Sequence, residues 1–421
     1  MKLLFCGGNS QSMISALRCL GRKGHQIDVA VPLSPGKFRI ARWFASKYAR
    51  RQFRMPHPLV QSAEFQQRLL QLVQGAGYDV IFPFDQRIAA WFALWKDELS
   101  QHTHVAAPDW PLFELVHDKA KLHGLLAANG FVVPRRYAYE SLEDLLRQEI
   151  CFPVVLKPRR SAGSLGLRYA ANRSELADAY REVSAFQSPC SDVEDYRRPL
   201  VQEYIPGQIH DGLFLCRHGE VRAAMTATRS ATYPVSGGIT VEAVTTHDPE
   251  LIRYCRRILE LIGYHGPCDV EVKRDARDGA YKLLEINPRI WGALELSIRA
   301  GIDFVEKSCE LAFSGNTALQ FDYRVGLKYW ILQRELMAIH QDQGNRWRRL
   351  LRLPGLFHRD TVSGIDLADW KPELAQLAMT IRLFTRKRQL LLPPGRSFSV
   401  KECQRMAAAA RLEASQVRTA A

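Results

Sequence analysis

Residues 266–295 read GPCDVEVKRDARDGAYKLLEINPRIWGALE, and they decide how the rest of the chain is interpreted. Apolar and polar residues alternate with period two on both sides of the turn-like ARDGA at 276–280, which predicts a β-hairpin. Side chains two apart in a strand share a face, so the oxygen-bearing side chains of this stretch gather on one surface. They belong to Asp269, Glu271, Glu285 and Asn287.

The register of this hairpin follows from a turn centred on Asp278. It places Glu271 opposite Glu285. The same count places Asp269 opposite Asn287. Carboxylates that face each other across a ladder repel, so such a face favours a bound cation, and oxygen ligands on a rigid scaffold suit Mg²⁺. The alternative is an exposed acidic face without a ligand, and this stretch alone leaves both interpretations open.

Length and composition indicate an ordinary globular protein with more than one domain. The chain has 421 residues, of which 47% are hydrophobic and 24% charged. Nine cysteines without C-x-x-C spacing argue against a disulfide framework or a zinc site and favour a reducing cytoplasm. The apolar run at the start is short for a signal peptide, and no segment approaches ~18 uncharged apolar residues. We therefore expect a soluble, cytoplasmic protein.

The net charge of +14 is concentrated in two regions. Residues 37–54 carry seven Lys or Arg and no acid, and residues 326–421 carry seventeen against eight Asp or Glu. Such regions bind anionic substrates, nucleic acid or membrane surfaces, or are simply solvated. No nucleic-acid fold signature accompanies them, so we expect no nucleic-acid partner. For the C-terminal region, packing onto the rest of the protein is favoured over weak contact with an anionic membrane surface, and the oligomeric state stays open.

The chain opens with a β-α-β pattern that continues as a three-layer α/β domain ending near residue 111. The linking GGNSQS lacks the G-x-G-x-x-G spacing, and no acidic residue follows the second strand, which argues against a dinucleotide site. Asp85 follows the fourth predicted strand and is expected to cap a helix. The predicted strands are 3–5, 27–31, 52–55 and 79–84, with a helix at about 12–21.

A phosphate site is predicted where FPVVLKPRRSAGSLGLRYA (152–170) brings a buried strand to Lys157 and then turns through small residues. Glycine and serine at 161–166 permit backbone N–H groups to converge on an anion. The alternative is a simple glycine-rich turn. A capped helix at 117–130 carries Lys119 before this strand. After it, the Gly- and Ser-rich loop 229–240 is expected to close over a site.

The order and spacing of these features resemble the ATP-grasp superfamily, nearest its carbamoyl-phosphate-synthetase-like branch. The resemblance covers about 111–321, and the opening β-α-β pattern resembles the pre-ATP-grasp domain that precedes this module. The motifs that carry it are Asp118-Lys119, Lys157-Pro158 with SAGSLG, QEYIPG at 202–207, and Glu271 followed by EINPR at 285–289.

The resemblance implies an α/β and α+β fold. A Rossmann-like pre-ATP-grasp domain (1–111) is followed by a two-lobed ATP-grasp domain (112–322) that divides at about residue 200. A basic, mostly helical extension (323–421) follows.

The resemblance also implies a role for individual residues. Lys119, Lys157, Ser161, Gly163, Ser164 and Gly166 match the contacts to the ATP phosphates. Gln202, Glu203 and Ile205 match the adenine linker, and Glu271, Glu285 and Asn287 match the metal ligands. Arg289 matches the contact to the transferred phosphoryl group, with Lys157 and Arg229 as further catalytic residues. Asp211 is the acid nearest the family's ribose ligand but is displaced along the chain, which leaves that contact open.

The activity implied by the resemblance is that of an ADP-forming carboxylate–amine ligase. Its cofactors are ATP and Mg²⁺, with Mn²⁺ as an alternative, and its partners are a small-molecule carboxylate and an amine. Phosphoryl transfer needs cations and positioning rather than a covalent enzyme intermediate, and no such nucleophile is indicated. The alternatives are an ATP-binding regulator or scaffold that does not ligate, and a Rossmann oxidoreductase, which the missing fingerprint opposes.

Overall fold

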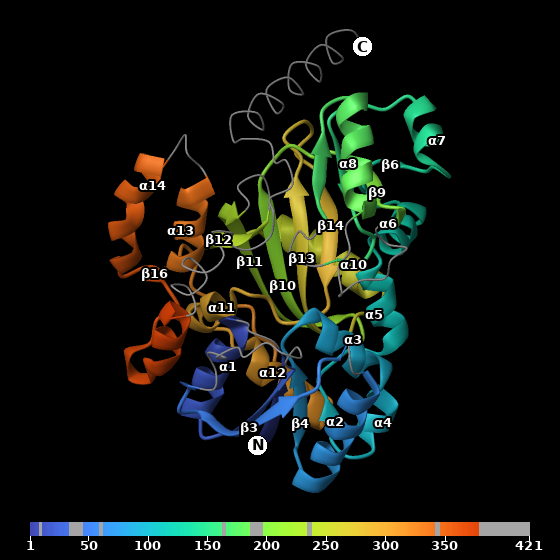
Figure 1. Ribbon diagram of the computed structural model, residues 1–421. Coiled ribbons are helices and arrows are strands. Elements are labelled where there is room, and N and C mark those ends of the chain that lie inside the picture. The colour runs from blue at the N-terminus through green and yellow to red at the C-terminus, as the bar shows by residue number, and fades with distance from the viewer. Residues whose placement is uncertain are drawn as a thin grey trace.

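Three β-sheets organise the computed structural model (Figure 1). In Figure 1 the seven-stranded sheet occupies the centre, the blue N-terminal elements lie below it, and the green helices α7 and α8 lie at the upper right. The structure describes residues 1–7, 11–32, 45–58, 62–161, 166–185, 197–233, 238–341 and 346–378. Gly163 and Ser164 lie outside the described residues, as does the end of the chain from residue 379.

The N-terminal sheet has five parallel strands in the order β3-β2-β1-β4-β5. The four predicted strands are confirmed, and so is the helix cap at Asp85, whose side chain accepts hydrogen bonds from the backbone of Arg87 and Ile88. The strands are β1 (Lys2–Cys6), β2 (Gln26–Pro32), β3 (Ala49–Met55), β4 (Val80–Pro83) and β5 (His104–Val105). The helices are α1 (Gln11–Arg22), α2 (Ser62–Ala76), α3 (Gln86–Leu94), α4 (Lys96–Ser100) and α5 (Trp110–His117).

The second sheet has four antiparallel strands in the order β6-β9-β7-β8. It is preceded by α6 (Lys119–Ala128), which is capped by Asp118 at its start and Asn129 at its end, as predicted. The strands are β6 (Arg136–Tyr137), β7 (Val154–Lys157), β8 (Arg168–Ala170) and β9 (Leu200–Glu203), and the helices are α7 (Leu142–Arg147) and α8 (Arg173–Ala185). Lys157 is the last residue of β7, where the sequence placed it.

The third sheet has seven strands in the order β14-β13-β10-β11-β12-β15-β16. One hydrophobic core packs α10 against it, and another joins it through α11 and α12 to β1, α1 and β2 of the first sheet. The strands are β10 (Ile209–Arg217), β11 (Glu220–Tyr233), β12 (Ile239–Thr246), β13 (Gly266–Arg274), β14 (Tyr281–Asn287), β15 (Lys328–Trp330) and β16 (Thr361–Val362). The helices are α10 (Pro249–Leu261), α11 (Leu294–Ala300) and α12 (Phe304–Ser314).

The expectation that Arg229 lies in a loop is wrong. β11 continues to Tyr233 and β12 begins at Ile239, so Arg229 belongs to a strand and its pairing with Ala243 is followed by register shifts. Glycine and serine indicated a loop here, but β-branched and aromatic residues such as Thr232 and Tyr233 favour strand and extend the ladder.

The described residues after 322, which end at residue 378, pack onto the other elements, as favoured by the sequence. β15 pairs with β12 and β16 with β15, so this region adds two strands to its helices. The buried Arg18 of α1 donates to Asp369 over 3.1 Å and to Gly364 O over 2.9 Å. Among the described helices, none is both long and apolar enough to span a bilayer. The helical elements are α13 (Leu332–Gln341), α14 (Arg346–Arg352), η2 (Leu353–Phe357) and η3 (Leu367–Asp369).

Candidate functional site

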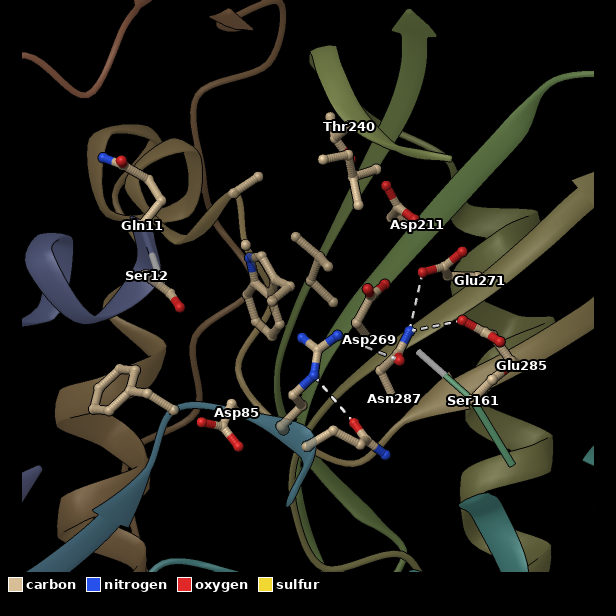
Figure 2. Close-up of a pocket in the computed structure, with 18 of the residues that line it drawn as sticks. Gln11, Ser12, Asp85, Ser161, Asp211, Thr240, Asp269, Glu271, Glu285 and Asn287 are labelled. Carbon is tan, nitrogen blue, oxygen red and sulfur yellow. Dashed lines mark hydrogen bonds between the residues drawn. The ribbon is translucent and has the colours of Figure 1, made fainter. Parts of the chain in front are cut away.

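The hairpin of β13 and β14 has the predicted register. Asp269 pairs with Asn287, and Glu271 pairs with Glu285. A bulge after Glu271 shifts the register, so Val272 lies opposite Leu283. Since the bulge lies on the turn side of the four oxygen-bearing residues, it leaves their common face intact (Figure 2).

A neighbouring strand adds Asp211 to this acidic face, directly opposite Glu271. Single carboxylate oxygens of Asp211, Asp269 and Glu271 all lie within 4.8 Å of one another. Arg229 neutralises part of this charge, because it donates to both oxygens of Asp211 over 2.6 and 2.8 Å and lies 2.8 Å from Glu271 Oε1. Burial, with the charge of Asp211, raises the pKa of Asp269. The chemistry of this donor set fits a hard divalent cation.

Two lysines approach the same face from the other side. Lys119 of α6 lies 3.1 Å from Glu285 Oε2 and donates to Ser161 O over 3.0 Å. Lys157 is directed at the hairpin and lies 3.4 Å from Leu284 O. Burial raises the pKa of Glu285, but Lys119 and Lys157 outweigh this effect and lower it to about 2. Burial and the charge of Lys119 lower the pKa of Lys157 to about 8.

Asn287 and Arg289 continue the site beyond the hairpin. Asn287 Nδ2 donates to Glu271 Oε1 over 3.0 Å and approaches Glu285 Oε1 at 3.4 Å, as the dashed lines in Figure 2 show. Rotation of this amide by half a turn would exchange nitrogen for oxygen, which is the atom a cation requires. Arg289 Nε donates to Gln86 Oε1 of α3 over 3.1 Å, which connects the site to the N-terminal sheet.

A small cavity of about 120 Å³ lies between the four-stranded and seven-stranded sheets. Its polar wall carries predicted phosphate and linker residues, and its apolar wall includes Val155, Leu167, Tyr169, Leu284 and the predicted linker residue Ile205. The Gln202 side chain bonds to His123 Nδ1 at 2.8 Å, and Glu203 accepts from Arg277 over 2.8 Å. Since these side chains already have protein partners, the linker is left with backbone groups for recognising a base. The polar residues are Lys119, Lys157, Ser161, Gln202, Glu203, Arg229, Glu271, Lys273 and Glu285.

A larger cavity of about 710 Å³ extends from the acidic face to the start of α1, where Gln11 and Ser12 line it (Figure 2). Both cavities are lined by Ser161, Arg229, Gly238, Glu271 and Glu285. The acidic face and its cations therefore lie where the two cavities meet. Such an arrangement can hold a nucleotide in one cavity and its reaction partner in the other, with the charged groups at the point of transfer.

The structure gathers most of the predicted site residues at these cavities. Asp211 lies on the acidic face with Arg229 rather than among the residues that line the smaller cavity, and Gly166, with φ +74°, lines neither cavity. Sequence reasoning missed the cavity residues Gln86, His117, Trp291 and Arg334. They come from α3, α5, α13 and the segment after β14, and no local spacing relates them to the hairpin. Burial and Lys119 lower the pKa of His117 to about 4.

Comparison with known proteins assigns the central module. Residues 196–330 match the family model described as ATP-grasp in the biosynthetic pathway with Ter operon. This chain contains an ATP-grasp domain. Over 206 residues it is 24% identical to D-aspartate ligase of Enterococcus faecium, a match covering 46% of this chain and 49% of the ligase. Over 193 residues it is 21% identical to the N-terminal section of the carbamoyl phosphate synthase large chain of Methanopyrus kandleri, covering 44% and 33% respectively.

A solved structure extends the likeness beyond the central module. The biotin carboxylase domain of the Hydrogenobacter thermophilus 2-oxoglutarate carboxylase, solved with MgADP, ADP and bicarbonate, has a TM-score of 0.60 and 19% identity. That likeness covers 77% of this chain and 73% of the carboxylase domain, and it confirms the predicted ATP-grasp fold class. The matched regions span less than two thirds of either curated relative.

Proposed function

We propose that this protein is an ATP- and Mg²⁺-dependent ligase that activates a carboxylate as an acyl phosphate, joins it to an amine and releases ADP and phosphate. The observation that carries the proposal is the meeting of the two cavities at Glu271 and Glu285, flanked by Lys119, Arg229 and Arg289. The likeness to a D-aspartate ligase supports the same class of reaction.

The charges of the site fit a magnesium nucleotide. Asp269 Oδ1 is buried without a hydrogen-bond partner in the described part of the chain. Asp269 also belongs to the group of carboxylates from which one oxygen each lies within 4.8 Å of the others. We assign Glu271, Glu285 and Asn287 to Mg²⁺, or to Mn²⁺ in its place, and Lys119 and Lys157 to the phosphates. When bound, the metal offsets the negative charge that develops on the transferred phosphoryl oxygens.

The residues of the chain would then act by position and charge. Lys157 holds an ammonium group on the nucleotide side of the hairpin, and Arg289 holds a guanidinium on the side of the larger cavity. A carboxylate bound beside Arg289 would attack the γ-phosphorus, and the positive groups would offset charge as its oxygen displaces ADP. Attack of the amine nitrogen on the acyl carbon then expels phosphate. The apolar part of the wall of the larger cavity would limit the access of water, which would otherwise hydrolyse the acyl phosphate.

The test is a ligation screen with mass detection. Protein is incubated with ATP, Mg²⁺ and pooled carboxylates and amines, and ADP is measured together with any new amide. The matched control is Glu285→Gln, which removes a proposed metal ligand with little change in size. ADP release that needs both pools and is lost in the control is the expected result. Tight ATP binding without ADP release above that of the control would instead identify a binding-only regulator.

We expect the reaction to take place in the cytoplasm. ATP is available there, and the reducing conditions preserve thiols. The described cysteines are free, and most of them are buried: Cys6, Cys216, Cys255, Cys268 and Cys309.

A further inference from the structure

Arg334 reaches the larger cavity from α13, a helix beyond the predicted boundary of the ATP-grasp domain. Its Nη1 donates to Thr240 O on β12 over 2.6 Å. Its Nη2 lies beside Gly292. A β-carbon added to Gly292 would be 3.8 Å from this nitrogen. The guanidinium is therefore fixed at the cavity wall by a backbone carbonyl and lies against a residue without a side chain.

The charge of Arg334 has no counterpart within the described residues. Arg229, on the same cavity, pairs with Asp211 and Glu271, whereas no described carboxylate forms an ion pair with Arg334. Burial lowers its pKa, and the charge of Arg229 acts in the same direction. A guanidinium has five N–H donors, and removing such a group from water without a neighbouring anion is energetically unfavourable. The site is built to receive a negative charge.

Of the described acids that line the cavity, none is paired with Arg334, and Asp269 and Glu271 lie 3.8 and 2.8 Å from Arg229. Asp85 accepts from the backbone at the start of α3, and Asp211 is held by Arg229. Glu285 is paired with Lys119 at the far end, where the smaller cavity begins. An anion that enters the larger cavity is therefore attracted to Arg334 rather than repelled there.

Part of the wall of this cavity is apolar, and polar residues such as Gln11, His117 and Arg160 line the remainder. Trp291 is 3% exposed, and its indole N–H has no acceptor in the described part of the chain, so it offers a second donor beside the apolar surface. The cavity has a volume of about 710 Å³, which is larger than the volume that a small dicarboxylic acid would fill. The large apolar residues of the wall include Phe84, Trp91, Trp110, Leu213, Ile239 and Leu296.

We propose that the amine substrate also carries a carboxylate on an apolar body, and that Arg334 binds this carboxylate and keeps it away from the phosphoryl-transfer site. The inference rests on the proposed function, because it takes the larger cavity to be the substrate site. Arg334 is then a specificity residue supplied by the C-terminal region. An amino acid with an apolar side chain has the required groups: an amine to react, a carboxylate to be held, and a body that matches the wall.

The experiment compares binding of phenylalanine, phenylalaninamide and phenethylamine by calorimetry, in the presence of MgADP. Wild-type protein should bind phenylalanine at least about tenfold more tightly than the two compounds without a carboxylate, as expected for a charge-assisted pair. Arg334→Gln should abolish this preference, and Arg334→Lys should retain part of it. Arg348→Gln, on the exposed face of α14, is the matched control and should behave as wild type.

Two results would overturn the proposal: a carboxylate preference that persists in Arg334→Gln, or no preference in wild-type protein. Binding of ADP and the melting temperature of each variant show whether the protein is folded, and Arg334→Lys provides a second variant if Arg334→Gln is not. Absence of ADP release from every substrate pair, with the carboxylate preference intact, would count against the ligase function alone.

Discussion

Lys119 Nζ lies 3.1 Å from Glu285 Oε2, and this pair joins α6 to β14 where the two cavities meet. Each group compensates the other's charge. A magnesium nucleotide would give both groups new partners, because phosphate oxygens attract the ammonium and the metal attracts the carboxylate. The pair is thus suited to a site that changes partners without leaving a buried charge uncompensated.

We predict that Glu285→Gln lowers Mg²⁺-dependent turnover by about 10²–10³, because a lost ligand misplaces the charge that stabilises the transition state. The melting temperature should fall modestly, because Gln fills the same space but Lys119 loses the partner that compensates its buried charge. The measurement is the rate of ADP release across a range of Mg²⁺ concentrations. The control is Glu250→Gln, a removal of the same charge at an exposed position of α10. Normal turnover of Glu285→Gln at low Mg²⁺ would remove Glu285 from the metal site.

We predict that nucleotide affinity falls as pH rises above about 8, because the pKa of Lys157 is lowered to about 8 and only its charged form attracts phosphate. Titration calorimetry with ADP from pH 7 to 10 would measure this. Lys157→Arg keeps its charge throughout that range, so its affinity should not fall with the same midpoint. Parallel pH profiles of the two proteins would show that Lys157 is not the titrating group.

The same pKa fixes the sign of a stability effect. The pKa of Lys157 is about 8 in the folded protein and about 10.4 in an unfolded chain, so the folded protein binds this proton less readily. Its burial therefore costs stability below pH 8, and this cost disappears as pH rises toward 10.4. The difference in melting temperature between wild-type protein and Lys157→Met should change in favour of the wild type as the pH rises from about 8 to about 10.4. A constant difference between the two proteins would contradict the assignment.

The central hairpin was predictable because its information is local. The alternation of apolar and polar residues across one turn places Asp269 and Glu271 on the same face. A shift of the strand register by one residue would bury the polar side chains in place of the apolar ones. The caps at Asp85 and Asp118 follow equally from short-range chemistry. The bulge after Glu271 was not predictable, because nothing in the alternation marks it.

The larger cavity could not be predicted because its residues are brought together only by packing. Gln86 meets Arg289 because one hydrophobic core holds the first sheet against the third, and this contact joins residues far apart in the chain. The position of Arg334 depends on the pairing of β15 with β12, which extends the central sheet. No local pattern in the sequence indicates this pairing. The domain boundaries near 111 and 322 and the roles of individual site residues stay predictions.

We predict that Gly207→Ala lowers the melting temperature by several degrees. Gly207 has φ +138°, and a β-carbon there would lie 2.0 Å from Arg274 O, so the linker after β9 would have to move. Gly75→Ala is the control, because its β-carbon would meet nothing within 4 Å inside α2 and alanine favours a helix. Thermal unfolding measures both. If Gly207→Ala melted like wild type, the close approach of the linker to Arg274 would be refuted.

The last prediction concerns the phosphorus atom that is attacked. The cations Lys119, Lys157 and Arg289 surround the place where the two cavities meet, and no described side chain there is assigned as an acyl carrier. We therefore expect a substrate carboxylate oxygen to attack the γ-phosphorus, breaking its bond to ADP and forming an acyl phosphate.

Hydroxylamine is small and strongly nucleophilic, so it should replace the amine. Its nitrogen would attack the acyl carbon and expel phosphate, so enzyme, Mg-ATP and the true carboxylate should yield a hydroxamate and ADP in equal amounts. Reactions without ATP, and with Glu285→Gln, are the controls. An enzyme that activates at the α-phosphorus would release AMP and pyrophosphate while still forming the hydroxamate. That outcome would retain ligation but overturn the phosphate roles of Lys157 and Arg289, because their charges would then lie at the wrong end of the triphosphate.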